Sequence, residues 1–423
     1  MRFTYKHTLY ASYLGYITQA IINNLAPLLF LILQQEFNIS LESIGILISL
    51  NFVVQIITDL LSAKFVDKIG YRTSIVGAHV LCTLGLISMG ILPYVFVNPY
   101  VGLAIAITIN GIGGGLIEVL ISPIVQSLPG DEKASAMSIL HSFYCWGQVI
   151  VVLLTTLYFY AFGTINWLYI PILWSIVPLF NMILFIKVPL STIEDNDVII
   201  PFQKLFTTRV FGLFIILMIC AGASEQAMSQ WVSLFAESGL KVSKTIGNLL
   251  GPCSFAILMG IARVFYGIKG SKINMKKALV FSSILCVISY LLAVFSKVPL
   301  VSLIGCSLCG LSVGIMWPGV FSLCAQYFPK GGTSMFAILA LAGDVGCTAG
   351  PGLVGFISNR VENATMTLSN NWFYSTSLTE IGLKTGLLFA IAFPVIMFFS
   401  VIVLRKNNVQ KSDYASSSNK SSK

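Results

Sequence analysis

Charged residues are scarce in this sequence. They make up only 10% of its 423 residues, against roughly 25% in an average soluble domain, and hydrophobic residues make up 56%. A chain with so few charges cannot cover a surface that faces water on all sides. We therefore predict an all-α polytopic membrane protein.

Other absences narrow the function. The nine cysteines lie almost wholly inside apolar runs, which is typical of small packing residues and not of a disulfide or metal site. No loop carries the His/Asp or Cys/His spacing of an enzyme, so we expect no catalysis, no cofactor and no metal. No basic and aromatic stretch outside the apolar runs suggests nucleic-acid binding. Residues 1–7 lead straight into an apolar run, so no cleavable signal peptide is expected.

Twelve apolar runs are long enough to cross a bilayer. They lie near residues 8–33, 43–66, 74–97, 99–127, 134–160, 165–187, 209–236, 244–268, 276–296, 299–327, 332–358 and 381–404. A polar linker over residues 188–208 separates the first six runs from the last six. We therefore predict one six-helix bundle over 1–187, a second over 209–404 and a disordered cytoplasmic tail over 405–423.

Basic residues predict the orientation of these spans. One side of the twelve-span topology holds five of the 25 Lys and Arg residues: Lys241, Lys244, Lys297, Arg360 and Lys384. The other 20 (25 minus 5) lie on the side that holds both termini. Because cytoplasmic loops are enriched in Lys and Arg, we place both termini in the cytoplasm and the chain in the cell membrane.

The two predicted bundles repeat each other in sequence. The loop after the second run reads AKFVDKIGYR, and the loop after the eighth reads GIKGSKINMKK, which places Lys68 opposite Lys272 and Arg72 opposite Lys276. The fourth and tenth runs share a glycine-rich start and a proline near the end. A duplication of this kind predicts a substrate site between the bundles, near the bilayer midplane.

The fourth run, GIGGGLIEVLISPIV, carries an acid inside an apolar segment. Gly111, Gly115, Glu118 and Ser122 recur at helical spacing and form a small, polar face. An acid inside a bilayer is costly and almost always faces a polar interior, so Glu118 is the leading candidate for both substrate binding and proton coupling. The alternative is a neutralised Glu that serves packing alone.

Other polar residues inside apolar runs are candidates for the same site. Glu225 and Asp344 are further candidates for proton coupling, although Glu225 is also compatible with a position near the outer membrane surface, in water. The predicted substrate-binding residues are Gln19, Asn23, Asn24, Glu118, Ser122, His141, Glu225, Gln226, Gln230, Trp231 and Trp317. Their amides, hydroxyls and rings suit a hydroxylated solute. For His141 and Trp317, packing is an equally good interpretation.

The loop over Ala63–Arg72 resembles the G-x-x-x-D-R/K-x-G-R/K signature of the major facilitator superfamily, with Ala63 where glycine is usual. Within that superfamily, GGLIEVLISPIV, SILHSFYCWG and AGPGLVGFISN resemble the fucose permease group of sugar–proton symporters. The resemblance implies that Glu118 corresponds to an acid that precedes Asn-Pro and His141 to a sugar-binding Gln. The group's proton-carrying Asp of the first helix is missing, and Asn23 and Asn24 are the nearest polar residues.

Four charged residues are expected near the inner ends of the helices. They are Asp59, Asp67, Arg72 and Arg263, which we interpret as gating residues or structural charges. For Asp67 the resemblance implies a role in holding the inner gate shut, and capping of a helix is the alternative.

These features predict a secondary active transporter that alternates access to a central cavity. The preferred function is uptake of a small polar solute, in the first place a sugar, by proton symport. The alternative is a proton-coupled drug or metabolite efflux antiporter, whose usual glycine-proline motif belongs in the fifth helix, where this chain reads CWGQVIVVLL. The expected partners are the solute, protons and the lipid bilayer, and we expect a functional monomer.

The topology makes a direct prediction. A cysteine at Asn196 should react with a membrane-impermeant maleimide only from the cytoplasmic side, and one at Asn363 only from outside, because an odd number of spans separates them. Right-side-out and inside-out vesicles distinguish the two cases. Labelling of both positions from the same side would contradict the twelve-span arrangement.

Overall fold

The computed structural model describes residues 3–129, 133–190, 208–269, 273–328, 332–368 and 378–404. Every regular element in these residues is a helix. The first half of the chain forms α1 (Tyr5–Phe37), α2 (Leu41–Ile69), α3 (Tyr71–Val95), α4 (Pro99–Ser127), α5 (Lys133–Phe162), α6 (Tyr169–Trp174) and α7 (Ile176–Lys187). The second half forms α9 (Arg209–Leu234), η1 (Phe235–Gly239), α10 (Lys244–Asn248), η2 (Leu249–Cys253), α11 (Ser254–Lys269), α12 (Met275–Phe295), α13 (Pro299–Val313), α14 (Met316–Tyr327), α15 (Gly332–Leu368), α16 (Leu378–Ala390) and α17 (Ala392–Val403).

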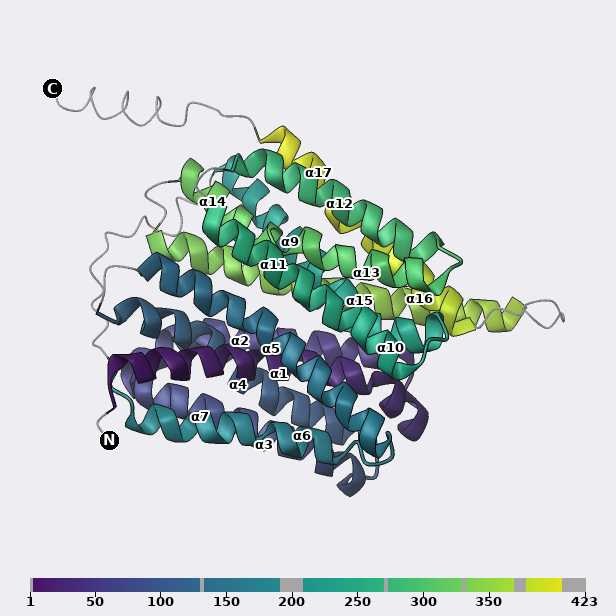
Figure 1. Ribbon diagram of the computed structural model, residues 1–423, viewed down its shortest axis with the longest axis horizontal. Coiled ribbons are helices and arrows are strands. Elements are labelled where there is room, and N and C mark those ends of the chain that lie inside the picture. The colour runs from purple at the N-terminus through teal and green to yellow at the C-terminus, as the bar shows by residue number, and fades with distance from the viewer. Residues whose placement is uncertain are drawn as a thin grey trace.

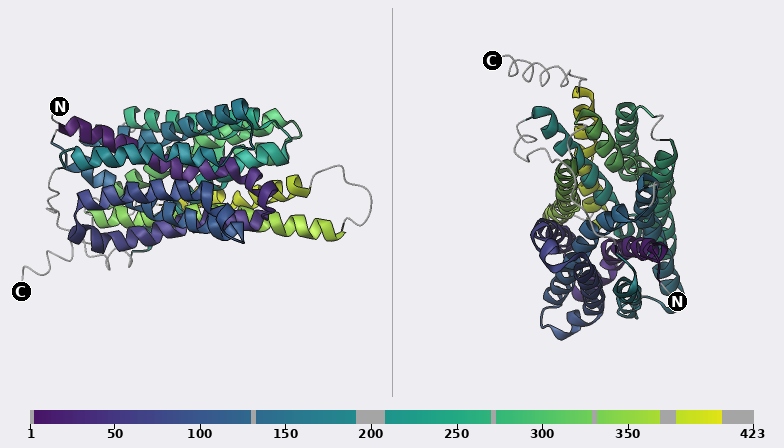
Figure 2. Two further views of the ribbon diagram at one scale, coloured as in Figure 1. Left: turned by 90° about the horizontal axis from the view of Figure 1, so that it is seen from below. Right: turned by 90° about the vertical axis from the view of Figure 1, so that its left-hand side faces the viewer.

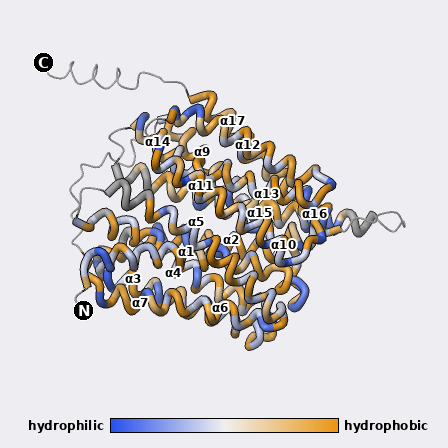
Figure 3. Tube along the Cα trace, viewed as in Figure 1, coloured by the Kyte–Doolittle hydropathy of each residue, from blue (hydrophilic) through white to orange (hydrophobic). Residues whose placement is uncertain are grey.

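The described residues contain 12 helical segments that are long and apolar enough to cross a membrane, which confirms the predicted all-α fold with twelve spans. Some spans consist of consecutive helices: α6 with α7, α9 with η1, α10 with η2 and α11, α13 with α14, and α16 with α17. Hydrophobic residues predominate along most of the length of the helices (Figure 3). Many of them, such as Leu157 and Phe281, remain exposed on the outside of the protein, as a lipid-facing surface requires.

Prolines explain three of the helix breaks. A proline has no N–H to donate to the carbonyl four residues earlier, and its ring crowds that carbonyl. Pro178 lies four residues after Trp174, where α6 ends, and Pro394 lies four residues after Ala390, where α16 ends. Pro318 stands in the same relation to Gly314, directly after the end of α13. The breaks therefore follow from local sequence.

The helices of the two halves form two groups, α1 to α7 and α9 to α17, which lie side by side in all three views (Figures 1 and 2). Because the number of spans is even, α1 begins and α17 ends at the same end of the molecule. We call this the terminal end and the opposite one the far end. The last turns of α15 project beyond the neighbouring helices at the far end (Figure 2).

The two halves meet most closely at the far end, along α2 and α15. Their backbones touch at Gly45 and Gly355, where a Cβ atom on Gly355 would lie 2.9 Å from the Cα of Gly45. Ser49 Oγ donates to the Thr348 carbonyl at 3.1 Å. One turn beyond the glycines, Asn359 Nδ2 donates to Glu42 Oε2 at 2.8 Å. We call this contact, residues 42–49 of α2 with 348–359 of α15, the far-end seam.

Within the second half, the packing of α9 on α15 generates a stability prediction. A Cβ atom on Gly346 would collide with the carbonyl oxygen of Ile219 and lie 2.8 Å from the nitrogen of Ala223, so Gly346→Ala should lower the unfolding temperature in detergent. Gly212→Ala is the matched control, since nothing lies within 4 Å of its Cβ position. Alanine favours a helix interior by about 1 kcal/mol over glycine, so the control should lose no stability. Equal unfolding temperatures for both variants would contradict the packing described.

Candidate functional site

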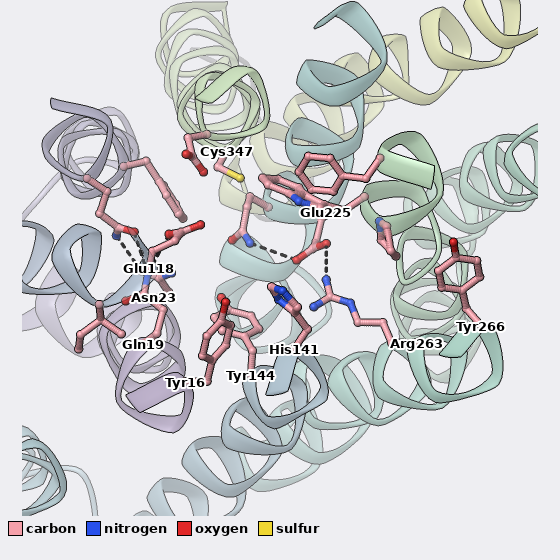
Figure 4. Close-up of a pocket in the computed structure, with 18 residues that line it drawn as sticks. Tyr16, Gln19, Asn23, Glu118, His141, Tyr144, Glu225, Arg263, Tyr266 and Cys347 are labelled. Atoms are coloured by element: carbon pink, nitrogen blue, oxygen red, sulfur yellow. Dashed lines mark hydrogen bonds and ion pairs between the residues drawn. The ribbon is translucent and has the colours of Figure 1, made fainter. Parts of the chain in front are cut away.

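A cavity of about 300 Å³ lies between the two halves (Figure 4). The first half contributes Tyr16, Gln19, Asn23, Phe52, Gln55, Ile117, Glu118, His141 and Tyr144 to its wall. The second half contributes Glu225, Gln226, Arg263, Tyr266, Trp317, Pro318, Phe321, Asp344 and Cys347. Both halves therefore offer polar and aromatic groups to one space.

The cavity lies on the terminal side of the contacts that join the halves. Besides the two bonds of the far-end seam, Asn248 Nδ2 of α10 donates to Thr156 Oγ1 at 3.0 Å, in the part of α5 that lies towards the far end of the molecule. Gln148 Nε2 donates to Ser229 Oγ at 3.1 Å, near the middle of α5. The cavity residue His141 lies two turns from Gln148 towards the terminal end, and its side chain is exposed. The two halves are thus in contact at the far end, and the cavity lies between these contacts and the terminal end.

Glycines of α4 bring the first polar group of the cavity together. A Cβ atom on Gly114 would lie 3.1 Å from Gln19 Oε1, and one on Gly115 would lie 3.0 Å from Asp59 Oδ1. Because these positions lack side chains, α1 and α2 approach the turn of α4 that carries Glu118. Gln19 Nε2 donates to Glu118 Oε2 at 3.2 Å and to Gln55 Oε1 at 3.0 Å.

Three carboxyl groups gather near this turn. Glu118 interacts electrostatically with Asp59 of α2 and with Asp344 of α15, which belongs to the other half. Asp59 Oδ1 and Asp344 Oδ2 are buried and accept no hydrogen bond. In the described part of the chain, no Lys or Arg side chain forms an ion pair with any of the three.

The second polar group is an ion pair on the opposite wall. Arg263 Nη2 of α11 lies 3.1 Å from Glu225 Oε2 of α9, and both side chains are largely shielded, with 17% and 8% of their surfaces exposed. Gln226 Nε2 contacts the other Glu225 oxygen at 3.4 Å. Arg263 Nε is buried and unbonded. Glu118 and the Glu225–Arg263 pair therefore face each other across the cavity (Figure 4).

Aromatic residues line the cavity beside these groups. The ring of Tyr16 stands edge-on to His141, with ring centroids 5.2 Å apart, and the Trp317 and Phe321 rings meet in the same manner at 6.3 Å. Tyr266 donates its hydroxyl hydrogen to Ser322 Oγ at 2.6 Å. Such side chains offer apolar faces with polar tips, a combination that suits a ring bearing hydroxyl groups.

The structure places most predicted binding residues on the cavity wall: Gln19, Asn23, Glu118, His141, Glu225, Gln226 and Trp317, with Asp344. Four others lie behind it. Ser122 Oγ bonds the Tyr16 hydroxyl at 3.1 Å, and Asn24 Nδ2 donates to the Tyr144 hydroxyl at 3.3 Å. Gln230 and Trp231 are buried, and the Trp231 ring nitrogen donates to the Pro351 carbonyl at 3.0 Å.

The predicted gating residues have different surroundings. Arg263 lies on the cavity wall, six residues before α11 ends at Lys269, and Asp59 packs against Gly115. Arg72 donates to the carbonyls of residues 185, 186 and 188 at 2.7 to 2.9 Å and so caps the end of α7. The side chain of Asp67 lies outside the described residues.

Several cavity residues of the first half were not predicted from the sequence, among them Gln55 and Tyr144. Gln55 contributes an amide and Tyr144 a hydroxyl to the wall. A signal was available for Gln55, because Asn51 and Gln55 stand one helical turn apart in an apolar run. Tyr144 looks like any aromatic residue of a membrane span, and only the packing of α5 shows its role.

Comparisons with known proteins agree with this architecture. The sequence matches the Major Facilitator Superfamily over residues 12–351. No curated protein matches it significantly. Among solved structures, a bacterial homolog of the human lysosomal transporter Spinster, in an inward-facing and occupied conformation, gives a TM-score of 0.74 at 12% identity, covering 94% of this chain and 96% of its own.

Two other solved transporters have the same fold. The nucleoside transporter NupG gives a TM-score of 0.70 at 12% identity, over 94% of this chain and 99% of its own. A variant of the fucose:proton symporter FucP of E. coli gives 0.62 at 14% identity, over 93% of this chain and 97% of its own. At such identities the likeness extends to the fold and not to the substrate.

Proposed function

As a member of the Major Facilitator Superfamily the chain is a multi-pass secondary transporter, and we propose that it takes up a small neutral solute, in the first place a sugar, together with protons. The two polar groups of the cavity carry the proposal. Each half supplies one of them, so a solute bound between them contacts both halves, as alternating access requires.

The balance of charges in the cavity supports proton coupling. Its wall holds three carboxyl groups, those of Glu118, Glu225 and Asp344, against one guanidinium, that of Arg263. Glu225 is paired with Arg263, whereas Glu118, among the residues that the structure describes, receives a hydrogen bond from the Gln19 amide alone. A buried carboxylate without a counter-charge is strongly unfavourable, and binding a proton removes the charge. Glu118 and Asp344 are therefore the proposed proton acceptors, and Glu225 is the partner of Arg263.

The lining supports a hydroxylated solute. Amides of Gln19, Asn23, Gln55 and Gln226 offer both donors and acceptors, and aromatic rings offer apolar faces. A cavity of about 300 Å³ lies at the small end of the range for ligand sites. The likeness of the fourth, fifth and eleventh spans to the fucose permease group favours a sugar over other small polar solutes.

The same charge balance favours a second candidate, a proton-coupled antiporter for a cationic drug or metabolite. A cation in the cavity would neutralise Glu118 or Asp344 as a proton does, and the two would then compete. The effect of a bound proton on solute binding distinguishes the two. In a symporter the proton strengthens solute binding, and in an antiporter the proton weakens it.

In the proposed orientation, the closed far end faces the extracellular side of the cell membrane and the cavity lies towards the cytoplasm. The distribution of Lys and Arg supports this orientation. In an importer, the state described here is the one from which solute and protons leave for the cytoplasm.

Uptake into proteoliposomes tests the proposal. Labelled L-fucose, D-galactose and D-glucose are offered with the interior at the same pH as the exterior or more alkaline. We expect an alkaline interior to drive accumulation of at least one sugar above its external concentration. Sugar entry that is indifferent to the gradient would exclude proton coupling. Uptake driven by an acidic interior would favour the antiporter, because protons that leave the vesicle would then exchange for solute that enters.

Glu118→Gln separates coupling from binding. Glutamine has nearly the shape of a protonated Glu and remains neutral, so accumulation driven by the pH gradient should be abolished while exchange of labelled sugar at equal pH survives. His141→Ala should lower sugar affinity but keep the response to the gradient. Glu36→Gln, a matched change at a carboxylate that binds the Trp167 ring nitrogen outside the cavity, should leave both activities intact. Accumulation by Glu118→Gln would move the coupling role to Asp344 or Glu225.

A further inference from the structure

A series of hydrogen bonds, linked at one point through the covalent bonds of Asn23, joins the two polar groups of the cavity. It starts in the second half, where Glu225 accepts from Arg263 Nη2 at 3.1 Å and from Gln226 Nε2 at 3.4 Å. Gln230 Nε2 then donates one hydrogen to Gln226 Oε1 at 3.0 Å and the other to the backbone carbonyl of Asn23 at 2.9 Å. The last bond crosses from α9 to α1, and thus from one half to the other.

The series continues through the first half to Glu118. Asn23 Oδ1 accepts from Gln55 Nε2 at 2.9 Å, and Gln55 Oε1 accepts from Gln19 Nε2 at 3.0 Å. The second hydrogen of Gln19 Nε2 goes to Glu118 Oε2 at 3.2 Å. Both hydrogens of the Gln19 and Gln230 amide nitrogens are thus used, and each amide has only one orientation that satisfies its neighbours.

Pro27 explains why the crossing lies at Asn23. In a regular helix the Asn23 carbonyl would accept the N–H of residue 27, but proline has none. A free carbonyl inside a membrane protein needs another donor, and the amide of Gln230 supplies it. The proline therefore turns a backbone group of α1 into a binding point for α9.

The unbonded oxygen of Gln19 shows how the series responds to a proton. Gln19 Oε1 is buried and has no partner, whereas a protonated Glu118 has a hydrogen to donate. Rotation of the Gln19 amide by half a turn would present Oε1 to Glu118 and to Gln55. Gln55 must then present its opposite amide atoms, which withdraws its donor from Asn23 Oδ1, an oxygen that Asn51 Nδ2 also bonds at 3.1 Å. The change thus reaches the side chain of Asn23, whose backbone carbonyl Gln230 holds.

We infer that this series couples Glu118 to the Glu225–Arg263 pair, and that Gln230 is the positioning residue that carries the coupling between the halves. The inference deepens the proposed function and rests on it, because it takes Glu118 as a proton acceptor. Binding of solute at the Glu225–Arg263 pair alters the hydrogen bond that Glu225 accepts from Gln226. Through Gln230 and Asn23, that alteration changes the hydrogen bond that Glu118 receives.

Other titratable groups also face Glu118, and the test has to separate them from the series. They are Asp59 of α2, Asp344 and Cys347 of α15, Tyr16 of α1 and His141 of α5. None of them contacts Gln230 through a hydrogen bond described here. A substitution at Gln230 therefore leaves their direct effects on Glu118 in place.

A double-mutant cycle with the proton as probe tests the inference. Infrared difference spectra of the purified protein follow the carboxyl band that Glu118→Gln removes as the pH changes. In the wild-type background, Glu225→Gln should change the proton affinity of Glu118 by about twofold or more, the lower limit for residues that share a network. The Gln230→Met background lacks both amide hydrogens of Gln230. In it, Glu225→Gln should change the proton affinity of Glu118 by less than in the wild-type background.

Two further variants make the result specific. Gln148→Met removes another buried amide that bridges the halves, to Ser229, but belongs to no bond of the series, so the effect of Glu225→Gln should persist in full. Pro27→Ala gives α1 an N–H that competes with Gln230 for the Asn23 carbonyl, so it should weaken the coupling without loss of the α1 helix. An undiminished effect in both Gln230→Met and Pro27→Ala would overturn the inference, as would no effect in the wild type. Failure of the proposed function shows separately, as uptake that ignores the pH gradient.

Discussion

Lipid offers no hydrogen bonds, so each polar group that the spans carry into the membrane needs its partner inside the protein. The carbonyl that Pro27 leaves free at Asn23 is bonded by Gln230, and the ring nitrogen of Trp231, one residue further on, finds the Pro351 carbonyl. Amides one helical turn apart on α1, α2 and α9 meet the same requirement by bonding one another. The positions of these helices around the cavity follow from this need, and the apolar surface only keeps them in the bilayer.

The sequence predicts the fold well because span length and hydropathy are local properties. All twelve spans lie where apolar runs of bilayer length occur, and the breaks before Pro178, Pro318 and Pro394 follow from the chemistry of proline. Polar residues in apolar runs also indicate the site, since Gln19, Glu118 and Glu225 all line the cavity. Their partners could not be predicted. The pairing of Glu225 with Arg263 depends on how far α11 is shifted and rotated against α9, and no local pattern records that.

Two of the contacts between the halves differ in chemistry. The far-end seam joins backbone to backbone at Gly45 and Gly355, and its hydrogen bonds at Ser49 and Asn359 involve no group of the cavity. The cavity, in contrast, joins the halves at the bond between Gln230 and the Asn23 carbonyl, which belongs to a series of amides between Glu118 and Glu225. Opening of the far-end seam therefore has to separate close-packed backbones, whereas the bonds at the cavity can respond to the charge of its acids.

The length of α15 has a practical consequence for work on this 46.0 kDa protein. A helix of 37 residues extends about 55 Å at 1.5 Å per residue, whereas the hydrocarbon core of a bilayer is about 30 Å thick. Its last turns therefore stand clear of the membrane, fixed at their base by the bond between Asn359 and Glu42. Small carriers are difficult particles for electron cryo-microscopy because little of them protrudes from the micelle. The protruding turns of the helix offer an epitope for an antibody fragment that would supply the missing feature, and one raised against them would also report whether the far-end seam has opened.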